Sequence, residues 1–248
     1  MRPTLLLLHG FPLDHTLWTP NVARLAREAE IIAPDLRGFG TNTSQPAIRS
    51  MDDLANDMFD LLDQRGIDQV IPCGLSMGGY VAMAMLARSP ERLAGLILCN
   101  TRSTADTEEA KQGRENSAKE AEQKGMAVIA RAMVPKVLGA TTCRTKPELS
   151  TTVEKMIARQ DARATAAASR AMALRPDRTE VLRSFAKPAL VITGSEDDLM
   201  PLPTSQAMVA ALPNAKLVVI PQAGHLSNLE KPDAFNEAVI AYLERSAD

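Results

Sequence analysis

Short, almost continuous apolar runs alternate along this chain with longer segments in which apolar residues recur every three or four positions. An uninterrupted apolar run is typical of a strand buried on both faces of a parallel sheet, whereas the second pattern is typical of an amphipathic helix. Six strands are predicted, over Thr4–His9, Glu30–Ala33, Val70–Leu75, Leu93–Asn100, Ala189–Gly194 and Lys216–Ile220. Alternating strands and helices predict a doubly wound α/β fold with a mainly parallel sheet.

The helical segments follow the strands closely. Met51, Leu54 and Met58 fall on one face of a helix that Ser50 can cap and that Gly66 follows. Further core helices are predicted over Met77–Ala87, Pro203–Leu212 and Asp233–Arg245.

The alternation stops between the fourth and fifth strands. Three helical stretches follow one another there: Asp106–Lys124, Gly125–Leu138 and Pro147–Arg175. The first is charged nearly all round, which predicts a solvated helix. A helical insert of roughly 85 residues is too long for a plain crossover. It predicts a helical cap, residues 101–186, over a core formed by residues 1–100 and 187–248.

Composition and charge narrow the class of protein. The chain has 248 residues, 45% of them hydrophobic, and a net charge of −2. This balance indicates neither a nucleic acid nor an anionic membrane as a partner. No apolar run approaches the ~20 residues of a membrane span, and the leucines at the start are too few for a signal sequence. We expect a cytoplasmic protein; the sequence does not indicate its oligomeric state.

Three cysteines, Cys73, Cys99 and Cys143, are widely spaced. The first two lie in apolar runs and are expected to be small buried residues. This pattern favours neither disulfides nor a metal site.

The turn after the third strand carries the first chemical signal, the sequence Gly74-Leu75-Ser76-Met77-Gly78. This is G-x-S-x-G between a predicted strand and a predicted helix, the setting of a nucleophile elbow. A serine held on such a sharp turn needs neighbours without side chains on both sides. The positive end of the helix would also lie at the serine. Ser76 is therefore the candidate nucleophile.

A serine hydroxyl needs a base, and the chain has three histidines, His9, His15 and His225. His225 follows the last strand and precedes the last helix, where the chain order serine, acid, histidine places the base. His9 ends the first strand beside Gly10 and is better suited to shaping a turn. His15 is expected to line the pocket or to face water.

The acid is expected in the loop after the fifth strand, which offers Glu196, Asp197 and Asp198. The residue pattern alone leaves open which of them orients the histidine. Two backbone N–H groups should form an oxyanion hole. Met77, the residue after the nucleophile, and Phe11, in the loop after the first strand, are the expected donors.

These motifs resemble the serine α/β hydrolases of the esterase and lactonase group, near the carboxylesterases and 3-oxoadipate enol-lactonases. The resemblance covers nearly the whole core. Besides the elbow it rests on His9-Gly10-Phe11-Pro12 with Trp18, Pro34-Asp35-Leu36-Arg37-Gly38-Phe39-Gly40, Gly194-x-x-Asp197-x-x-x-Pro201 and Gly224-His225. In that family the acid lies three residues after the glycine, which implies Asp197, with Asp198 as runner-up.

The chain departs from that family at its start, because the two usual first strands have no counterpart. The resemblance then implies six parallel strands in the order 4-3-5-6-7-8 of the family's labels. The switch point beside the first strand would bring Phe11 and Ser76 to one crevice.

The expected activity is hydrolysis of a small-molecule carboxylic ester or lactone through an acyl-enzyme on Ser76. His225 would act as general base and acid, oriented by Asp197, with no metal and no cofactor. An apolar pocket is expected from residues that include Trp18 and Leu226. The insert offers cationic residues that would mostly face solvent: Arg131, Lys136, Arg159, Arg163, Arg170 and Arg175. Neutral substrates of short to medium acyl length are therefore expected.

Other functions remain open on the same residues. The triad could serve perhydrolase or haloperoxidase-like chemistry or the hydrolysis of a carbon–carbon bond. The chain could also be a hydrolase-like ligand-binding protein with vestigial turnover, or an α/β protein in which the motif is coincidental. Haloalkane dehalogenation is disfavoured, because the resemblance implies an aspartate at the elbow for that reaction.

Overall fold

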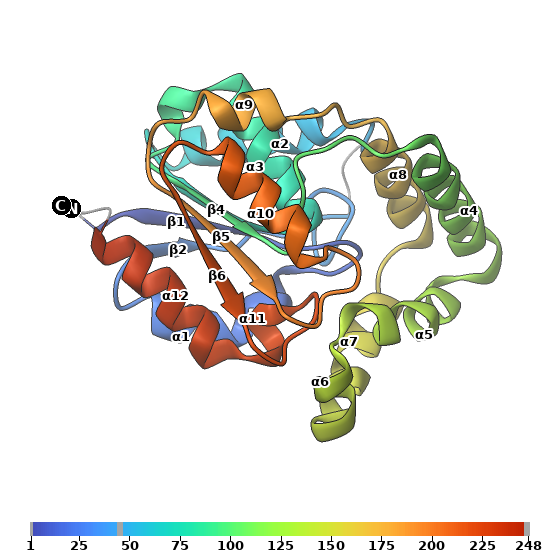
Figure 1. Cartoon of the computed structure of the whole chain (residues 1–248). Coiled ribbons are helices and arrows are strands. Elements are labelled where there is room, and N and C mark those ends of the chain that lie inside the picture. The colour runs from blue at the N-terminus through green and yellow to red at the C-terminus, as the bar shows by residue number, and fades with distance from the viewer. Residues whose placement is uncertain (1, 44–46, 246–248) are drawn as a thin grey trace.

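The computed structural model describes residues 2–43 and 47–245. Its centre is a parallel sheet of six strands in the order β2-β1-β3-β4-β5-β6 (Figure 1). The strands are β1 (Thr4–Leu8), β2 (Glu30–Ile32), β3 (Ile71–Leu75), β4 (Leu96–Cys99), β5 (Ala189–Gly194) and β6 (Ala215–Ile220). The predicted fold class, strand number and strand order are thus confirmed.

Two hydrophobic layers cover the sheet, and β1 shows how they are separated. Leu6 and Leu8 pack into the layer under α2 (Met51–Gln64), α3 (Met77–Arg88) and α10 (Leu202–Ala211). Leu5 and Leu7 point to the opposite layer, under α1 (Thr19–Leu25) and α12 (Pro232–Arg245). Because successive side chains of a strand alternate between its faces, a run of leucines serves both layers at once. Figure 1 shows the two groups of helices on either side of the sheet.

Local signals position the helices that border the site. Ser50 caps α2 as expected: its hydroxyl accepts a hydrogen bond from the N–H of Asp53 at 3.1 Å, and the Asp53 carboxylate accepts one from the N–H of Ser50. Cys73 and Cys99 are fully buried on the neighbouring strands β3 and β4, with 3.9 Å between their sulfur atoms. All three cysteines are free thiols.

Between β4 and β5 the described chain forms only helices. They are α4 (Glu108–Lys124), α5 (Met126–Val137), α6 (Ala140–Thr145), α7 (Pro147–Ala158), α8 (Ala162–Ala173) and α9 (Thr179–Arg183). Helices α4 to α8, which we call the cap helices, stand together at one side of the sheet in Figure 1. In contrast, α9 contacts α3 and α10 of the core. The division of the chain into residues 101–186 and a core remains our interpretation of this arrangement.

Two expectations about the insert need correction. The predicted helix Pro147–Arg175 is two helices, because the chain turns before Asp161, whose side chain accepts from the N–H of Ala164 and begins α8. Helix α4 is not solvated all round. Its small residues Ala118 and Ala121 are buried, and α4 packs along α8. No helix in the described ranges is long and apolar enough to cross a membrane.

Candidate active site

The turn between β3 and α3 holds Ser76 in an unusual backbone conformation, with φ 54° and ψ −111°. The neighbouring glycines leave room for this turn. A β-carbon on Gly74 would lie 2.3 Å from the carbonyl oxygen of Gly78, and one on Gly78 would lie 2.1 Å from that of Leu8. Real contacts of this kind do not occur, so any larger residue would force the backbone to move. The serine therefore projects from a strained turn, the geometry that a nucleophile elbow requires.

Ser76, His225 and Asp197 form one chain of hydrogen bonds. The Oγ atom of Ser76 lies 2.8 Å from Nε2 of His225, and Nδ1 of His225 lies 2.9 Å from Oδ2 of Asp197. A neutral imidazole satisfies both contacts when its proton is on Nδ1. His225 and Asp197 are each 5% exposed. The three residues that sequence reasoning selected from separate loops thus lie side by side.

Asp197 is the only one of the three loop carboxylates that contacts His225. Asp198 is exposed to solvent, and the carboxylate of Glu196 accepts hydrogen bonds from the N–H and hydroxyl of Thr141. Burial raises the pKa of Asp197. The nearby charge of His225 and the hydrogen bonds that Asp197 accepts outweigh this effect, so its pKa lies below the usual value. Asp197 is therefore ionised near neutral pH.

Asn100, which the sequence analysis did not single out, supports the acid. It follows β4 with a φ of 48°, and its Nδ2 donates to Oδ2 of Asp197 at 2.8 Å and to the carbonyl oxygen of Gly224 at 3.2 Å. Its Oδ1 accepts from the hydroxyl of Ser227 at 2.6 Å. One side chain thus links the acid to the loop that carries His225, residues 221–226, which we call the histidine loop. An asparagine directly after a buried strand was the available signal, because asparagine tolerates positive φ.

Glu230 was also missed, although it is completely buried beside the histidine loop. Its Oε1 accepts from the N–H of Gly224, and its Oε2 accepts from the N–H of Gly139, both at 2.9 Å. The N–H of His225 in turn donates to the carbonyl oxygen of Val137 at the end of α5. The histidine loop is therefore bonded to the cap helices as well as to the core.

The two residues expected to supply the oxyanion hole, Phe11 and Met77, belong to segments that adjoin the serine. Met77 is the first residue of α3, so its N–H has no partner inside that helix. The N–H of Phe11 donates to no protein acceptor within the described ranges. A β-carbon on Gly10 would lie 3.5 Å from Cβ of Ser76, which shows how closely the loop before Phe11 approaches the elbow. The two N–H groups that the sequence suggested thus belong to the two segments that meet at the elbow.

His9 has a structural role, as its position before a glycine indicated. It is fully buried, its Nδ1 contacts the carbonyl oxygen of Gly10 at 3.0 Å, and its Nε2 accepts from the N–H of Leu36 at 2.9 Å. Burial lowers the pKa of His9. The neutral ring therefore joins the loop after β1 to the loop after β2.

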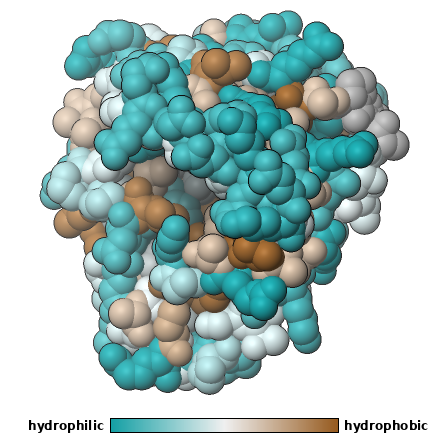
Figure 2. All heavy atoms as spheres, turned by 90° about the vertical axis from the view of Figure 1, so that its right-hand side faces the viewer, coloured by the Kyte–Doolittle hydropathy of each residue, from teal (hydrophilic) through white to brown (hydrophobic). Residues whose placement is uncertain are grey.

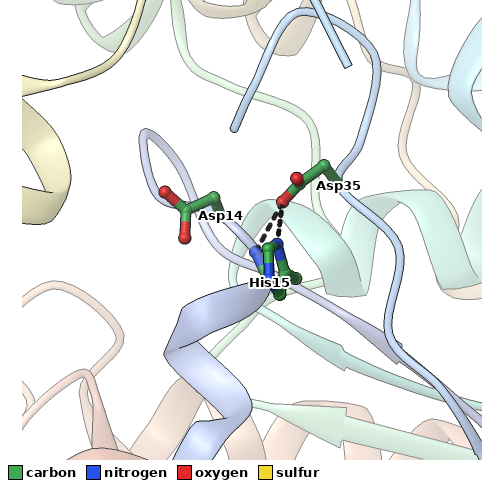
Figure 3. A group of neighbouring side chains, drawn as sticks. All are labelled: Asp14, His15 and Asp35. Atoms are coloured by element: carbon green, nitrogen blue, oxygen red, sulfur yellow. Dashed lines mark hydrogen bonds and ion pairs between the residues drawn. The ribbon is translucent and has the colours of Figure 1, made fainter. Parts of the chain in front are cut away.

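His15 faces Asp35, and with Asp14 these residues form a cluster of potential metal ligands (Figure 3). The carboxylate of Asp35 accepts from the backbone N–H of His15 and contacts its Nδ1 at 2.7 Å, while its other oxygen accepts from Thr41. Asp14 is directed away from this pair in Figure 3 and accepts from Arg159. The carboxylate oxygens already have protein donors, which indicates a structural cluster.

Ser76 and His225 line a cavity of about 320 Å³. Figure 2 views the molecule from the side of the cap helices and shows a hollow with both hydrophobic and hydrophilic residues at its rim. Most apolar residues of the cavity wall come from the loop after β1, the cap helices and the loop after β5. They are Phe11, Met133, Val137, Met172, Leu199 and Met200.

Two predicted pocket residues, Trp18 and Leu226, do not line this cavity. Trp18 is fully buried in the layer under α1 and α12, where its ring lies 5.8 Å from that of Phe235. Leu226 is buried in the same layer. Both follow loops that reach the site, but their side chains point into the core rather than toward Ser76.

The cations of the cavity wall also differ from those expected. Arg102, in the loop after β4, and Arg114, on α4, line the cavity together with Asp106. The six insert cations expected from sequence are not part of this wall. Arg175 lies behind it, bonded to Asp106, and Arg170 pairs with glutamates of α4.

The fold and the site together define a class. The molecule is a doubly wound α/β protein with a serine on the strained turn between strand and helix, and with a histidine in hydrogen-bonding distance of that serine. The chain belongs to the alpha/beta hydrolase family, whose model matches residues 5–238.

Its relatives include enol-lactonases and esterases. The 3-oxoadipate enol-lactonase 2 of Acinetobacter baylyi is 28% identical over 98% of this chain and 90% of its own length. A thermophilic esterase from Thermogutta terrifontis, solved with malate bound, is 38% identical with a TM-score of 0.95, over 98% of this chain and 90% of that one. The enol-lactonase from Burkholderia xenovorans LB400 is 27% identical with a TM-score of 0.91, over 98% of this chain and 92% of that one. A bromoperoxidase from Bacillus anthracis shares the fold. It is 22% identical with a TM-score of 0.85, over 98% of this chain and 92% of that one.

Proposed function

We propose that this protein is a serine hydrolase that cleaves carboxylic esters or lactones through an acyl-enzyme on Ser76. The observation that carries the proposal is the chain of hydrogen bonds from Ser76 through His225 to Asp197. A serine becomes a competent nucleophile when a base within hydrogen-bonding distance can take its proton. The base is itself oriented by a buried carboxylate, which completes the arrangement of a catalytic triad.

The proposed reaction has two halves, and Ser76, His225 and Asp197 act in both. His225 takes the proton of Ser76 while Oγ attacks the carbonyl carbon, and the negative oxygen that forms accepts hydrogen bonds from the N–H groups of Phe11 and Met77. His225 then gives its proton to the leaving alcohol oxygen, which leaves the acyl group on Ser76. A water molecule then attacks the acyl carbon while His225 takes its proton, and His225 gives that proton to Oγ of Ser76 as the bond to the serine breaks and the acid is released. Asp197 stabilises the imidazolium in both halves.

The comparisons support the ester or lactone as substrate. Proteins named as enol-lactonases and as an esterase match this chain over nearly its whole length. The volume of the cavity, about 320 Å³, also suits a small molecule. Perhydrolysis and carbon–carbon hydrolysis remain alternatives on the same residues. The likeness to bromoperoxidases is a likeness of fold and gives no separate support to that chemistry.

The test is hydrolysis of p-nitrophenyl acetate by Ser76→Ala. Turnover should fall by ~10⁴ or more, as for other triad nucleophiles, while the circular dichroism spectrum is retained. Ser184→Ala, at an exposed serine directly after α9, is the matched control and should keep its activity. A fluorophosphonate should also label the wild-type protein at Ser76, as seen by peptide mass spectrometry. Near-normal hydrolysis by folded Ser76→Ala would refute the mechanism.

A further inference from the structure

The cavity wall holds a second polar group besides the serine and histidine. Arg102 and Arg114 both donate to the carboxylate of Asp106, and Arg175 donates to it from behind the wall at 2.8 Å. Three guanidinium groups thus share one carboxylate. Asp106 is the only acidic residue in the described wall of the cavity, so the group has an excess of two positive charges. We call these four residues the arginine cluster.

The excess charge is permanent in the ordinary pH range. Burial raises the pKa of Asp106, but hydrogen bonds from Arg175 and Arg114 lower it far more, so the carboxylate stays ionised. Arginine side chains keep their charge in proteins. The cluster therefore presents a net positive charge to the cavity whether or not a substrate is bound.

The arginines also have donors that the protein does not use. The Nε atom of Arg102 is buried without a hydrogen-bond partner among the described residues. Arg114 donates from Nε to Asp106, and its Nη1 reaches only the sulfur of Met172, a weak acceptor, at 3.5 Å. Arg175 has its side chain 4% exposed and donates to the carbonyl oxygens of Met172 and Thr104, but its Nε is likewise buried without a partner among the described residues. Each of the three arginines thus keeps a donor without a protein oxygen acceptor, and two of them, Arg102 and Arg114, line the cavity.

We propose that the arginine cluster is a subsite for a carboxylate of the substrate, so that the ester or lactone cleaved at Ser76 carries a free acid group. The inference rests on the proposed function, since Ser76 and the cluster line one cavity. A guanidinium and a carboxylate form strong, often bidentate, charge-assisted hydrogen bonds. Leaving either charge unpaired in a partly buried cavity is unfavourable. This proposal is the opposite of the preference for neutral substrates that the sequence suggested.

The first experiment compares kcat/KM for esters that differ in one charge. The monomethyl esters of succinate, glutarate and adipate are paired with methyl alkanoates of equal chain length. We expect the anionic ester to be preferred at least tenfold for at least one length. Acetoxy acids, which carry the carboxylate on the alcohol side, show which product of cleavage the subsite holds. If the neutral ester is preferred at every chain length, whether the carboxylate is on the acyl side or on the alcohol side, the subsite is refuted.

Substitutions then locate the effect. Arg114→Gln should reduce the ratio of anionic to neutral kcat/KM at least tenfold, and Arg114→Lys, which keeps the charge, should retain part of it. Arg170→Gln is the matched control. Arg170 bonds Glu115 and Glu122 across the same pair of helices without lining the cavity, so its loss should leave the ratio unchanged. An unaltered ratio in Arg114→Gln would overturn the proposal.

The outcomes separate this inference from the proposed function. If neither kind of ester is hydrolysed, the proposed function fails; if both are hydrolysed without a preference for the anion, only the subsite fails. Should Arg114→Gln not fold, the wild-type protein decides. Glutarate should then inhibit p-nitrophenyl acetate hydrolysis competitively, and less strongly as NaCl is raised. Equal inhibition by the uncharged glutaramide would refute an anion subsite.

Discussion

Replacing Asp197 by asparagine keeps the size of the side chain and exchanges one acceptor oxygen for an NH₂ group. The carboxylate is bonded on both oxygens: Oδ1 accepts from the backbone N–H groups of Leu199 and Met200, both at 3.0 Å, and Oδ2 accepts from Asn100 and His225. Asparagine can satisfy only one of these two pairs. The backbone N–H groups cannot rotate away, so its oxygen should stay with them and its NH₂ group should face His225.

That orientation of the asparagine exchanges the tautomer of His225. An NH₂ group needs an acceptor, so Nδ1 of His225 must lose its proton and Nε2 must carry it. The nitrogen that faces Ser76 could then no longer accept the serine proton. In the best-studied protease the same exchange lowers kcat by ~10⁴. This corresponds to about 5 kcal/mol of transition-state stabilisation, since each tenfold change in rate is worth about 1.4 kcal/mol.

The assay is kcat/KM for p-nitrophenyl acetate together with the melting temperature. Asp198→Asn is the control, because Asp198 is the exposed neighbour in the same loop. We expect Asp197→Asn to lose about four orders of magnitude while it remains folded, and Asp198→Asn to keep its activity. If Asp197→Asn retains a tenth of the activity, or if Asp198→Asn is the inactive variant, the assignment of the acid is wrong.

Three further outcomes are expected. Glu230→Gln should lower both kcat and the melting temperature, because an NH₂ group would face a buried N–H at a cost of about 1–3 kcal/mol, whereas the exposed Glu237→Gln should change neither. Asp35, whose pKa is lowered from 3.8 to about 2, stabilises the fold at pH values above 3.8 and loses this effect as the pH falls toward 2. The free energy of unfolding of Asp35→Asn should therefore be about 2 kcal/mol below wild type at pH 6 in urea titrations, and the gap should narrow by pH 3. Ester hydrolysis should decline at acid pH, because an imidazolium cannot accept the proton of a serine; a flat profile in folded protein would contradict histidine as the base.

The fold could be predicted because uninterrupted apolar runs of five or six residues that alternate with helical segments are typical of the buried strands of a parallel sheet. Among the strands, only the ends were misplaced. Leu93 belongs to an apolar run, but it forms an isolated bridge with Val70 before β4 begins at Leu96. Apolar residues that approach a sheet through the core are indistinguishable in sequence from those that pair in it.

The site could be predicted only in part. Ser76 and His225 carry local signals, whereas the choice of Asp197 needed the spacing seen in a family. Arg114 could not be assigned to the cavity, because a helix that is charged nearly all round does not indicate which side faces inward. The role of Glu230 depends on N–H groups from separate segments, which become neighbours only in the folded chain.

The bond from His225 to Val137 has a consequence for how this family could acquire new substrates. The backbone of the cap helices also passes so close to the histidine loop that a β-carbon on Gly139 would lie 2.8 Å from the nitrogen of Gly224. A cap borrowed from a relative therefore could not be exchanged as an independent module. The grafted cap would need a glycine at position 139 and an acceptor for the N–H of His225. Without them, the exchange that changes the specificity would also displace the general base.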